Sequence, residues 1–167
     1  MLKEASAIAK NEFHPIVLSG WSAGYGAIRE ILAVESNWSS VDGVILIDGM
    51  HTGYDPEGKP GPLKPEGLQT FLKFAQAAVQ GRKRMLVVHS EIFPGTFAST
   101  TETADWLLEQ LNVKRHLVLK WGPLGTQQIS EAKQGNFQLL GFAGNSAPDH
   151  VDLLHALAEW LRKLSLI

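Results

Sequence analysis

Residues 16–27 read IVLSGWSAGYGA, and this stretch determines how the chain is interpreted. The apolar run at 16–18 is long enough for one buried strand, and residues 23–34 carry apolar side chains at helical spacing. Ser22 lies between the two, with a glycine two positions before it and another two positions after it. A serine at such a tight turn is held in strained backbone geometry, and its hydroxyl projects above the sheet.

The rest of the chain alternates short apolar runs with amphipathic segments. Such alternation implies βαβ crossovers, so we expect an α/β fold with a mostly parallel sheet and helices on both faces. Further strands are predicted at 44–47, 85–88, 113–121 and 137–142, and further helices at 2–11, 68–79 and 100–111 and from Asp149 onward. We expect the strand at 113–121 to be half exposed with Leu117, Leu119 and Trp121 on one side, and the last helix to bury Leu154, Leu157, Leu161 and Leu164.

Composition limits the possible classes of protein. With 167 residues, 44% of them hydrophobic and 19% charged, the chain is expected to form a single globular domain over residues 1–167. The net charge of −2 provides no basic surplus, so nucleic-acid binding is not expected. No apolar run is long enough to span a bilayer, cysteine is absent, and no secretory signal is evident, which weakly favours a cytoplasmic location.

Residues 51–67 (HTGYDPEGKPGPLKPEG) are dense in glycine and proline. A long loop of this kind within a compact domain is uncommon unless it serves as a lid or a binding loop. A floppy surface insertion is the alternative, and the sequence alone does not decide between the two.

The turn around Ser22 has the properties that nucleophilic catalysis requires. A helix that begins there directs free N–H groups at developing negative charge, and the backbone N–H of Ala23 would be one oxyanion donor. The same pattern also suits a glycine-rich turn used only for packing, or one that holds a phosphate. The sequence pattern alone leaves these alternatives open.

Four segments together resemble the α/β-hydrolase superfamily: IVLSGWSAGYGA (16–27), VILIDGMH (44–51), MLVVHS (85–90) and APDHVDLLHALAEWL (147–161). In order they are similar to the nucleophile strand and elbow, the next two parallel strands, and the histidine loop before the closing helix. The resemblance covers only the second half of that fold, so it implies an α/β-hydrolase-like domain that lacks the usual N-terminal strands.

This resemblance implies a serine hydrolase that acts on an ester, with Ser22 as nucleophile, His150 as base and Ala23 N–H as oxyanion donor. Asp48 is the first candidate for the acid and Glu91 the second, because the more usual position after the third strand holds no aspartate. Neither a cofactor nor a metal is implied. His150 could instead cap the last helix behind Asp149, and Asp48 could belong to a strand-end turn.

The missing first half has two further consequences. The strand at Ile16–Leu18 would lie at a sheet edge, and a bare apolar edge invites pairing with a second copy or a partner chain that carries the missing strands. It could also be covered by the N-terminal helix, or the chain could be a fragment. A catalytically inactive hydrolase-like domain used for binding or scaffolding is therefore the alternative function, and acyl transfer to an acceptor other than water is a third.

Overall fold

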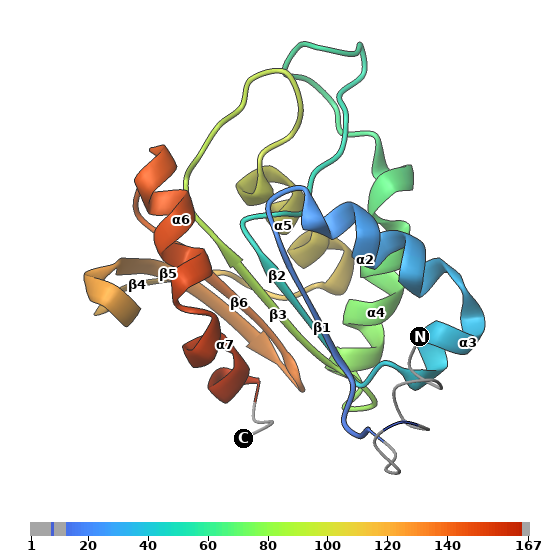
Figure 1. Cartoon of the computed structure of the whole chain (residues 1–167). Helices are drawn as coiled ribbons and strands as arrows, with labels where there is room; N and C mark the ends of the chain where they lie inside the picture. Colours follow the sequence, from blue (N-terminus) through green and yellow to red (C-terminus); the bar gives the residue numbers. More distant parts are fainter. Residues whose placement is uncertain (1–7, 9–12, 165–167) are drawn as a thin grey trace.

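A six-stranded sheet forms the centre of the protein in the computed structural model, which describes residue 8 and residues 13–164 (Figure 1). Apart from residue 8, the helix predicted over 2–11 lies outside these described residues. The strand order is β1-β2-β3-β6-β5-β4. Neighbours among β1, β2, β3 and β6 pair in parallel, whereas β5 pairs antiparallel with both β6 and β4. The strands are β1 (Val17–Trp21), β2 (Gly43–Ile47), β3 (Arg84–His89), β4 (His116–Trp121), β5 (Gln127–Gln134) and β6 (Phe137–Phe142).

Helices cover both faces of this sheet, as the alternating pattern predicts. The α-helices are α2 (Gly24–Ala33), α3 (Glu35–Ser40), α4 (Gln69–Val79), α5 (Thr100–Leu111), α6 (Ala147–His155) and α7 (Leu157–Lys163), and short 3₁₀ turns lie at η1 (Pro65–Leu68) and η2 (Pro123–Gly125). Helices α6 and α7 pack on one face, and α2, α4 and α5 on the other (Figure 1). The α/β class with a mostly parallel sheet is therefore confirmed.

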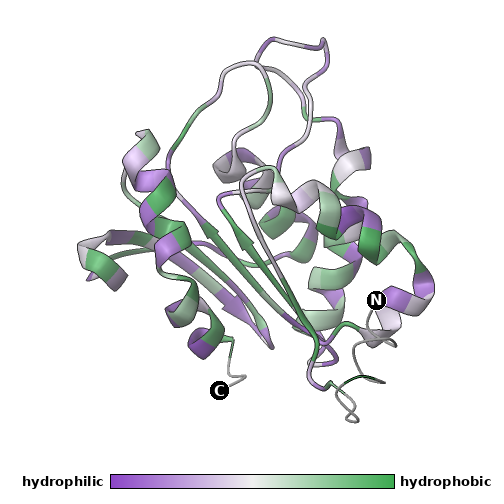
Figure 2. Cartoon of the chain, viewed as in Figure 1, coloured by the Kyte–Doolittle hydropathy of each residue, from purple (hydrophilic) through white to green (hydrophobic). Residues whose placement is uncertain are grey.

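The two faces explain the continuous apolar runs of the central strands. In β2, Val44 and Leu46 belong to the core beneath α2, α4 and α5, whereas Ile45 and Ile47 belong to the core beneath α6 and α7. All four side chains are fully buried. A strand that is covered on both faces needs apolar residues at every position, and Figure 2 shows this hydrophobic character along the central strands.

The antiparallel side of the sheet departs from the sequence-based expectation. Strand β5 was not anticipated, because its sequence QQISEAKQ is mostly polar. The predicted strand at 113–121 begins only at His116, and its apolar side faces outward, with Leu117, Leu119 and Trp121 each at least 77% exposed. Strand β4 lies at an edge of the sheet, where within the described residues it pairs only with β5.

The last helix also differs from its prediction. The chain forms two helices that meet at Ala156, and this break changes which side chains face the core. Leu153, Trp160 and Leu164 are buried, whereas three of the four leucines expected in the core (Leu154, Leu157 and Leu161) are only partly covered. The N-cap is Ser146 and not Asp149, because the two residues form a capping box in which Asp149 is the third helical residue.

The glycine- and proline-rich loop at 51–67 is anchored at several points. Tyr54 is fully buried and its hydroxyl donates to the Glu102 carboxylate at the start of α5 at 2.9 Å. Burial together with this carboxylate raises the pKa of Tyr54 to about 12. Backbone hydrogen bonds from Asp55 N to Pro62 O and from Lys64 N to Gly53 O close the loop on itself. These contacts argue against the floppy insertion.

The parallel strands place their carboxyl ends at one edge of the sheet. Ser22 follows β1, Asp48 follows β2, and Ser90 follows β3, so side chains from distant parts of the sequence meet there. Strand β1 occupies the other lateral edge of the sheet, where the sequence places Ile16–Leu18. Among the described residues, none of the helices combines the length and the apolar character that crossing a bilayer requires.

Candidate functional site

Ser22 occupies a sharp turn between β1 and α2. Its φ angle is 52°, in the left-handed region that side chains other than glycine rarely adopt. The turn is held because Ser22 N donates to Ile47 O at 3.0 Å. Gly20 permits the close approach of strand and helix, since a Cβ there would lie 2.7 Å from Ile28 Cδ1 and 3.1 Å from the Gly24 carbonyl carbon. The strained serine expected from the sequence is therefore present.

The glycines around the turn are not equivalent. A Cβ on Gly24 would meet nothing within 4 Å among the described residues, so this second glycine is not needed for packing as the sequence pattern suggested. Gly49, in the loop after β2, is the second position at which a side chain would not fit. A Cβ there would lie 2.8 Å from Ser22 N and collide with the serine backbone. The loop after β2 therefore packs directly against the turn.

Asp48 and His150 are in direct contact, although 102 positions separate them. His150 Nδ1 lies 2.8 Å from Asp48 Oδ2, and the Asp48 side chain is only 3% exposed. A buried carboxylate on Nδ1 fixes the ring orientation and leaves Nε2 as the nitrogen that can accept a proton. Asp48 also has a positive φ of 43°, which makes it a second left-handed residue in this site. Its contact with His150 and its positive φ go beyond what a simple strand-end turn requires.

Ser90 holds the Asp48 carboxylate from the other side, and the sequence analysis did not identify it. Its hydroxyl donates to Asp48 Oδ2 at 2.5 Å and its backbone N–H donates to Asp48 Oδ1 at 3.0 Å. The segment after β3, where the resemblance suggested an acid, therefore supplies a serine that orients the acid of the preceding strand. Glu91, the second candidate, is exposed and forms no hydrogen bond with His150 in the described chain.

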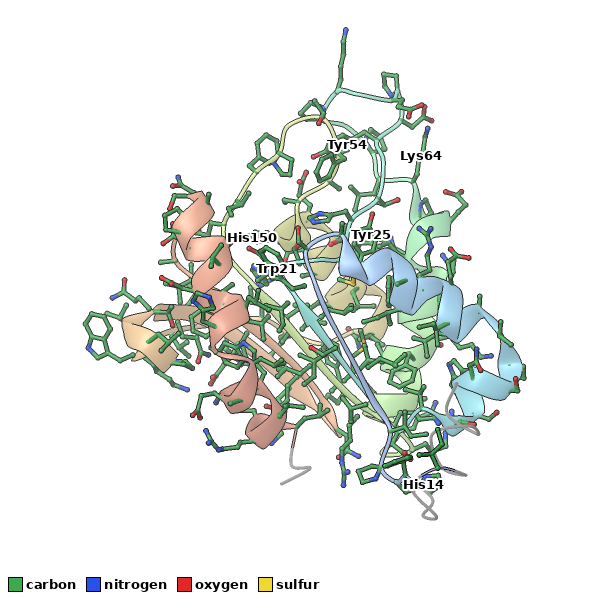
Figure 3. The ribbon with its side chains drawn as sticks, viewed as in Figure 1. His14, Trp21, Tyr25, Tyr54, Lys64 and His150 are labelled. Carbon is green, nitrogen blue, oxygen red and sulfur yellow. The ribbon has the colours of Figure 1, made fainter. Side chains whose placement is uncertain are left out.

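Trp21 fixes the other end of the histidine. Its indole N–H donates to His150 O at 3.0 Å, and the two rings lie 4.6 Å apart between centroids (Figure 3). His150 itself lies in the first turn of α6 and not in a loop before it, because its backbone N–H already donates to Ser146 O. The capping function considered for His150 is performed by Ser146 and Asp149. The His150 imidazole therefore does not cap α6.

Ser22 and His150 line the same cavity. This cavity has a volume of about 140 Å³ and is also lined by Asp48, His51, Ile92, Pro94 and Phe97. Within the described residues no hydrogen bond joins Ser22 Oγ to His150, and Nε2 of His150 has no partner. Hydrogen bonds between catalytic groups are often loose in a free enzyme and shorten only around substrate, so shared lining is compatible with proton transfer.

Ser22 also lines a larger pocket. Its volume is about 410 Å³, and it is lined by Ser22, Ala23, Tyr25, Arg29, His51, Thr52, Gly53 and Phe97. Ala23 is exposed, and its backbone N–H has no hydrogen-bond partner in the described part of the chain, so it can serve an oxyanion. The start of the loop at 51–67 thus lines the pocket, as expected of a binding loop. Among the aromatic residues near the site, Tyr25 lines the pocket, whereas Trp21 contacts His150 and Tyr54 donates a hydrogen bond to Glu102 of α5.

His51 borders both cavities. Its Nδ1 lies 2.9 Å from Ala98 O, and a carbonyl can only accept, so Nδ1 carries the proton. Burial lowers the pKa of His51, which keeps the ring neutral at pH 7. Its Nε2 is therefore a hydrogen-bond acceptor, and the ring that lines both cavities carries no positive charge.

His89 belongs to a separate cluster behind the site. It is 2% exposed, its Nδ1 donates to Ser90 O at 2.9 Å, and its Nε2 accepts from Arg115 Nη1 at 3.0 Å. Burial and the adjacent guanidinium lower the pKa of His89. Arg115 is in turn paired with Asp105 at 2.6 Å. With both ring nitrogens engaged, His89 is a structural residue.

Neither cluster is arranged as a metal centre. In the part of the chain that the structure describes, no group of three or more histidine, aspartate or glutamate side chains converges so as to hold a metal ion. The His150 imidazole and the Asp48 carboxylate are in contact, and Ser22 lines the same cavity.

The comparisons with known proteins add no family to this description. No protein-family model, no curated protein and no solved structure matches the chain. The fold establishes the α/β class, and any narrower assignment depends on the site.

Proposed function

We propose that the protein is a serine hydrolase of the α/β-hydrolase type that cleaves a carboxylic ester through an acyl-enzyme. Ser22, His150 and Asp48 are the proposed triad, and Ala23 N–H is the proposed oxyanion donor. The observation that carries the proposal is the contact between buried Asp48 and Nδ1 of His150, on a cavity that Ser22 also lines.

The proposed reaction follows from these positions. His150 Nε2 accepts the Ser22 proton as Oγ attacks the ester carbonyl, and Asp48 stabilises the resulting imidazolium. Ala23 N–H binds the oxyanion of the tetrahedral intermediate. His150 then gives its proton to the departing alcohol. In the second half-reaction water is deprotonated by His150 and releases the acid from Ser22.

The experiment that tests this proposal is labelling with a fluorophosphonate. The probe should modify the folded protein at Ser22, and Ser22→Ala should abolish the label. Ser19→Ala is a matched control, because Ser19 lies three residues earlier, on β1, and is exposed. A folded wild-type protein that remains unlabelled and does not hydrolyse short esters faster than Ser22→Ala would reject the proposal.

A second candidate function is protein binding without catalysis, and the exposed apolar side of β4 favours it. Leu117, Leu119, Trp121 and Leu124 are each at least 65% exposed at an edge of the sheet. Edge strands with such side chains pair readily with another copy of the same strand. Sedimentation equilibrium of the wild type and of Leu119→Lys tests this candidate, which predicts a dimer that the substitution dissociates. Pairing through the β1 edge predicts a dimer that Leu119→Lys leaves intact.

A further inference from the structure

The two cavities that meet at Ser22 differ in size and in chemical character. The smaller one contains His150 and Asp48, and Ile92, Pro94 and Phe97 supply its apolar lining. The larger one contains Ala23, and Tyr25, Arg29 and Thr52 supply polar groups. Their volumes are about 140 and 410 Å³. An ester bound across Ser22 must place one part in each cavity.

The proposed chemistry decides which part goes where. The alcohol must leave next to the group that protonates it, and His150 lines only the smaller cavity. The carbonyl oxygen must point to Ala23 N–H, which lies on the larger pocket. The alcohol is therefore expected to be small and apolar, and the acyl chain to extend into the larger pocket.

Arg29 gives the acyl pocket its charge. It is the only arginine or lysine among the lining residues, no lining residue is acidic, and His51 is neutral. Tyr25 and Arg29 are four positions apart on α2, so they share a face and lie about 6 Å apart along the helix axis. Helical side chains lean toward the N-terminus, which directs the guanidinium back toward Tyr25 and Ser22.

The guanidinium is available to a ligand. Its described ionic partner is the neighbouring Glu30, at 3.0 Å, and the two side chains are 37% and 71% exposed. An exposed pair of this kind contributes little and is easily exchanged for a better acceptor. The loop at 51–67 closes the same region, because a Cβ on Gly67 would lie 3.8 Å from Arg29 Nη1 and 3.2 Å from Thr52 Oγ1.

We propose that the substrate is a monoester of a dicarboxylic acid with a small apolar alcohol, whose free carboxylate is bound by Arg29 at the far end of the acyl pocket. A guanidinium binds a carboxylate through two parallel N–H···O bonds. This inference rests on the proposed hydrolase activity and specifies its substrate class.

The test compares matched methyl esters by following methanol release. Monomethyl glutarate carries the carboxylate, and methyl pentanoate is its uncharged counterpart of the same length. Monomethyl glutarate should have a kcat/KM at least about tenfold higher, and Arg29→Gln should lower the ratio of the two kcat/KM values by about tenfold or more. Arg29→Lys should restore part of the ratio, and Glu30→Gln should raise it, because the competing carboxylate is removed.

The control is Arg82→Gln, which removes an exposed arginine that lines neither cavity and should leave the ratio unchanged. Equal ratios in the wild type and Arg29→Gln, with methyl pentanoate still hydrolysed, would overturn the inference and leave the hydrolase proposal standing. Preference for acetoxyacetate, which carries its carboxylate on the alcohol, over propyl acetate would also overturn it. If the wild type hydrolyses none of these esters, the hydrolase proposal itself fails.

Discussion

Two of the histidines at the carboxyl edge of this sheet, His150 and His89, differ in their surroundings. His150 has a carboxylate on Nδ1 and no partner on Nε2 within the described residues, and its side chain is 21% exposed. His89 donates from Nδ1 to a backbone carbonyl, and its Nε2 is occupied by Arg115. Of the two, only His150 lines the cavity beside Ser22 and has a carboxylate in contact with Nδ1.

The comparison shows that two histidines at the same edge of a sheet can have different hydrogen-bond environments. The two rings are connected through Ser90, which donates to Asp48 from its hydroxyl and backbone N–H and accepts from His89 through its carbonyl. One residue therefore belongs to both clusters. His89 donates a hydrogen bond to the Ser90 carbonyl and so holds the Ser90 backbone in place. Ser90 in turn holds the Asp48 carboxylate, which contacts His150 Nδ1.

Asp48→Asn is expected to have the largest effect on the His150 cluster. An amide on Nδ1 favours the wrong tautomer of His150 and cannot stabilise the imidazolium, so ester kcat is expected to fall about 10⁴-fold. The counterpart in the other cluster is Arg115→Gln, which leaves the buried Nε2 of His89 without its partner. That variant should lose about 1–3 kcal/mol of unfolding free energy and keep its kcat. Equal kinetic losses in both variants would mean that the two clusters are not functionally distinct.

Gly49→Ala tests the geometry beneath the site. The added methyl group collides with the Ser22 backbone, and a displacement of about 1 Å at a nucleophile costs about 100-fold in kcat. Gly24→Ala is the matched control, because its methyl group has open space and should change kcat by less than about threefold. Both rates are measured on one short ester, with circular dichroism to verify folding. If Gly24→Ala is the more damaging substitution, the packing described for the elbow is wrong.

Ser90→Ala should have a smaller effect, since Asp48 keeps its bond from the Ser90 backbone N–H. Loss of the hydroxyl lets the carboxylate reorient, and kcat is expected to fall about tenfold with little change in KM. Ser90→Thr retains a hydroxyl and should recover most of the rate. A purely structural role would instead lower stability in both variants without this recovery of kcat.

The local features of the site could be predicted from the sequence, whereas its long-range contacts could not. The turn at Ser22 depends only on the strand, the glycine and the helix around it. The pairing of Asp48 with His150 depends on how α6 docks over β2, so Asp48 and Glu91 stayed open as alternatives. Ser90 had no signal at all, because one serine after a strand resembles any other until the register of β2 and β3 places it beside Asp48.

The same reasoning explains why the antiparallel side of the sheet differs from its prediction. Strand β5 buries Gln128, Ser130 and Ala132 at alternate positions, and two of the three are polar. Their hydrogen bonds make this burial possible, since Ser130 Oγ accepts from Arg115 and Gln128 Nε2 donates to Glu131. A strand whose buried polar side chains are hydrogen-bonded in this way lacks the apolar alternation that sequence analysis detects. The parallel strands, which are covered by helices, were predicted because burial alone determines their composition.

The smallest expected effect concerns stability and pH. Burial and the charge of Arg115 lower the pKa of His89 below the value of 6.5 that it has in the unfolded chain. In the folded protein, the nearby carboxylates of Asp48 and Asp105 oppose this shift. The folded state therefore binds fewer protons than the unfolded state just below pH 6.5, and the free energy of unfolding falls as the pH decreases through this range. His51, whose pKa is also lowered by burial, adds to the same dependence of stability on pH.

Urea unfolding at pH 7.5 and pH 5.5 measures this effect. The unfolding free energy should decrease less between the two pH values in His89→Gln than in the wild type, whereas His116→Gln, at an exposed position, should show the full decrease. An equal loss in wild type and His89→Gln would show that His89 is not held neutral by the fold.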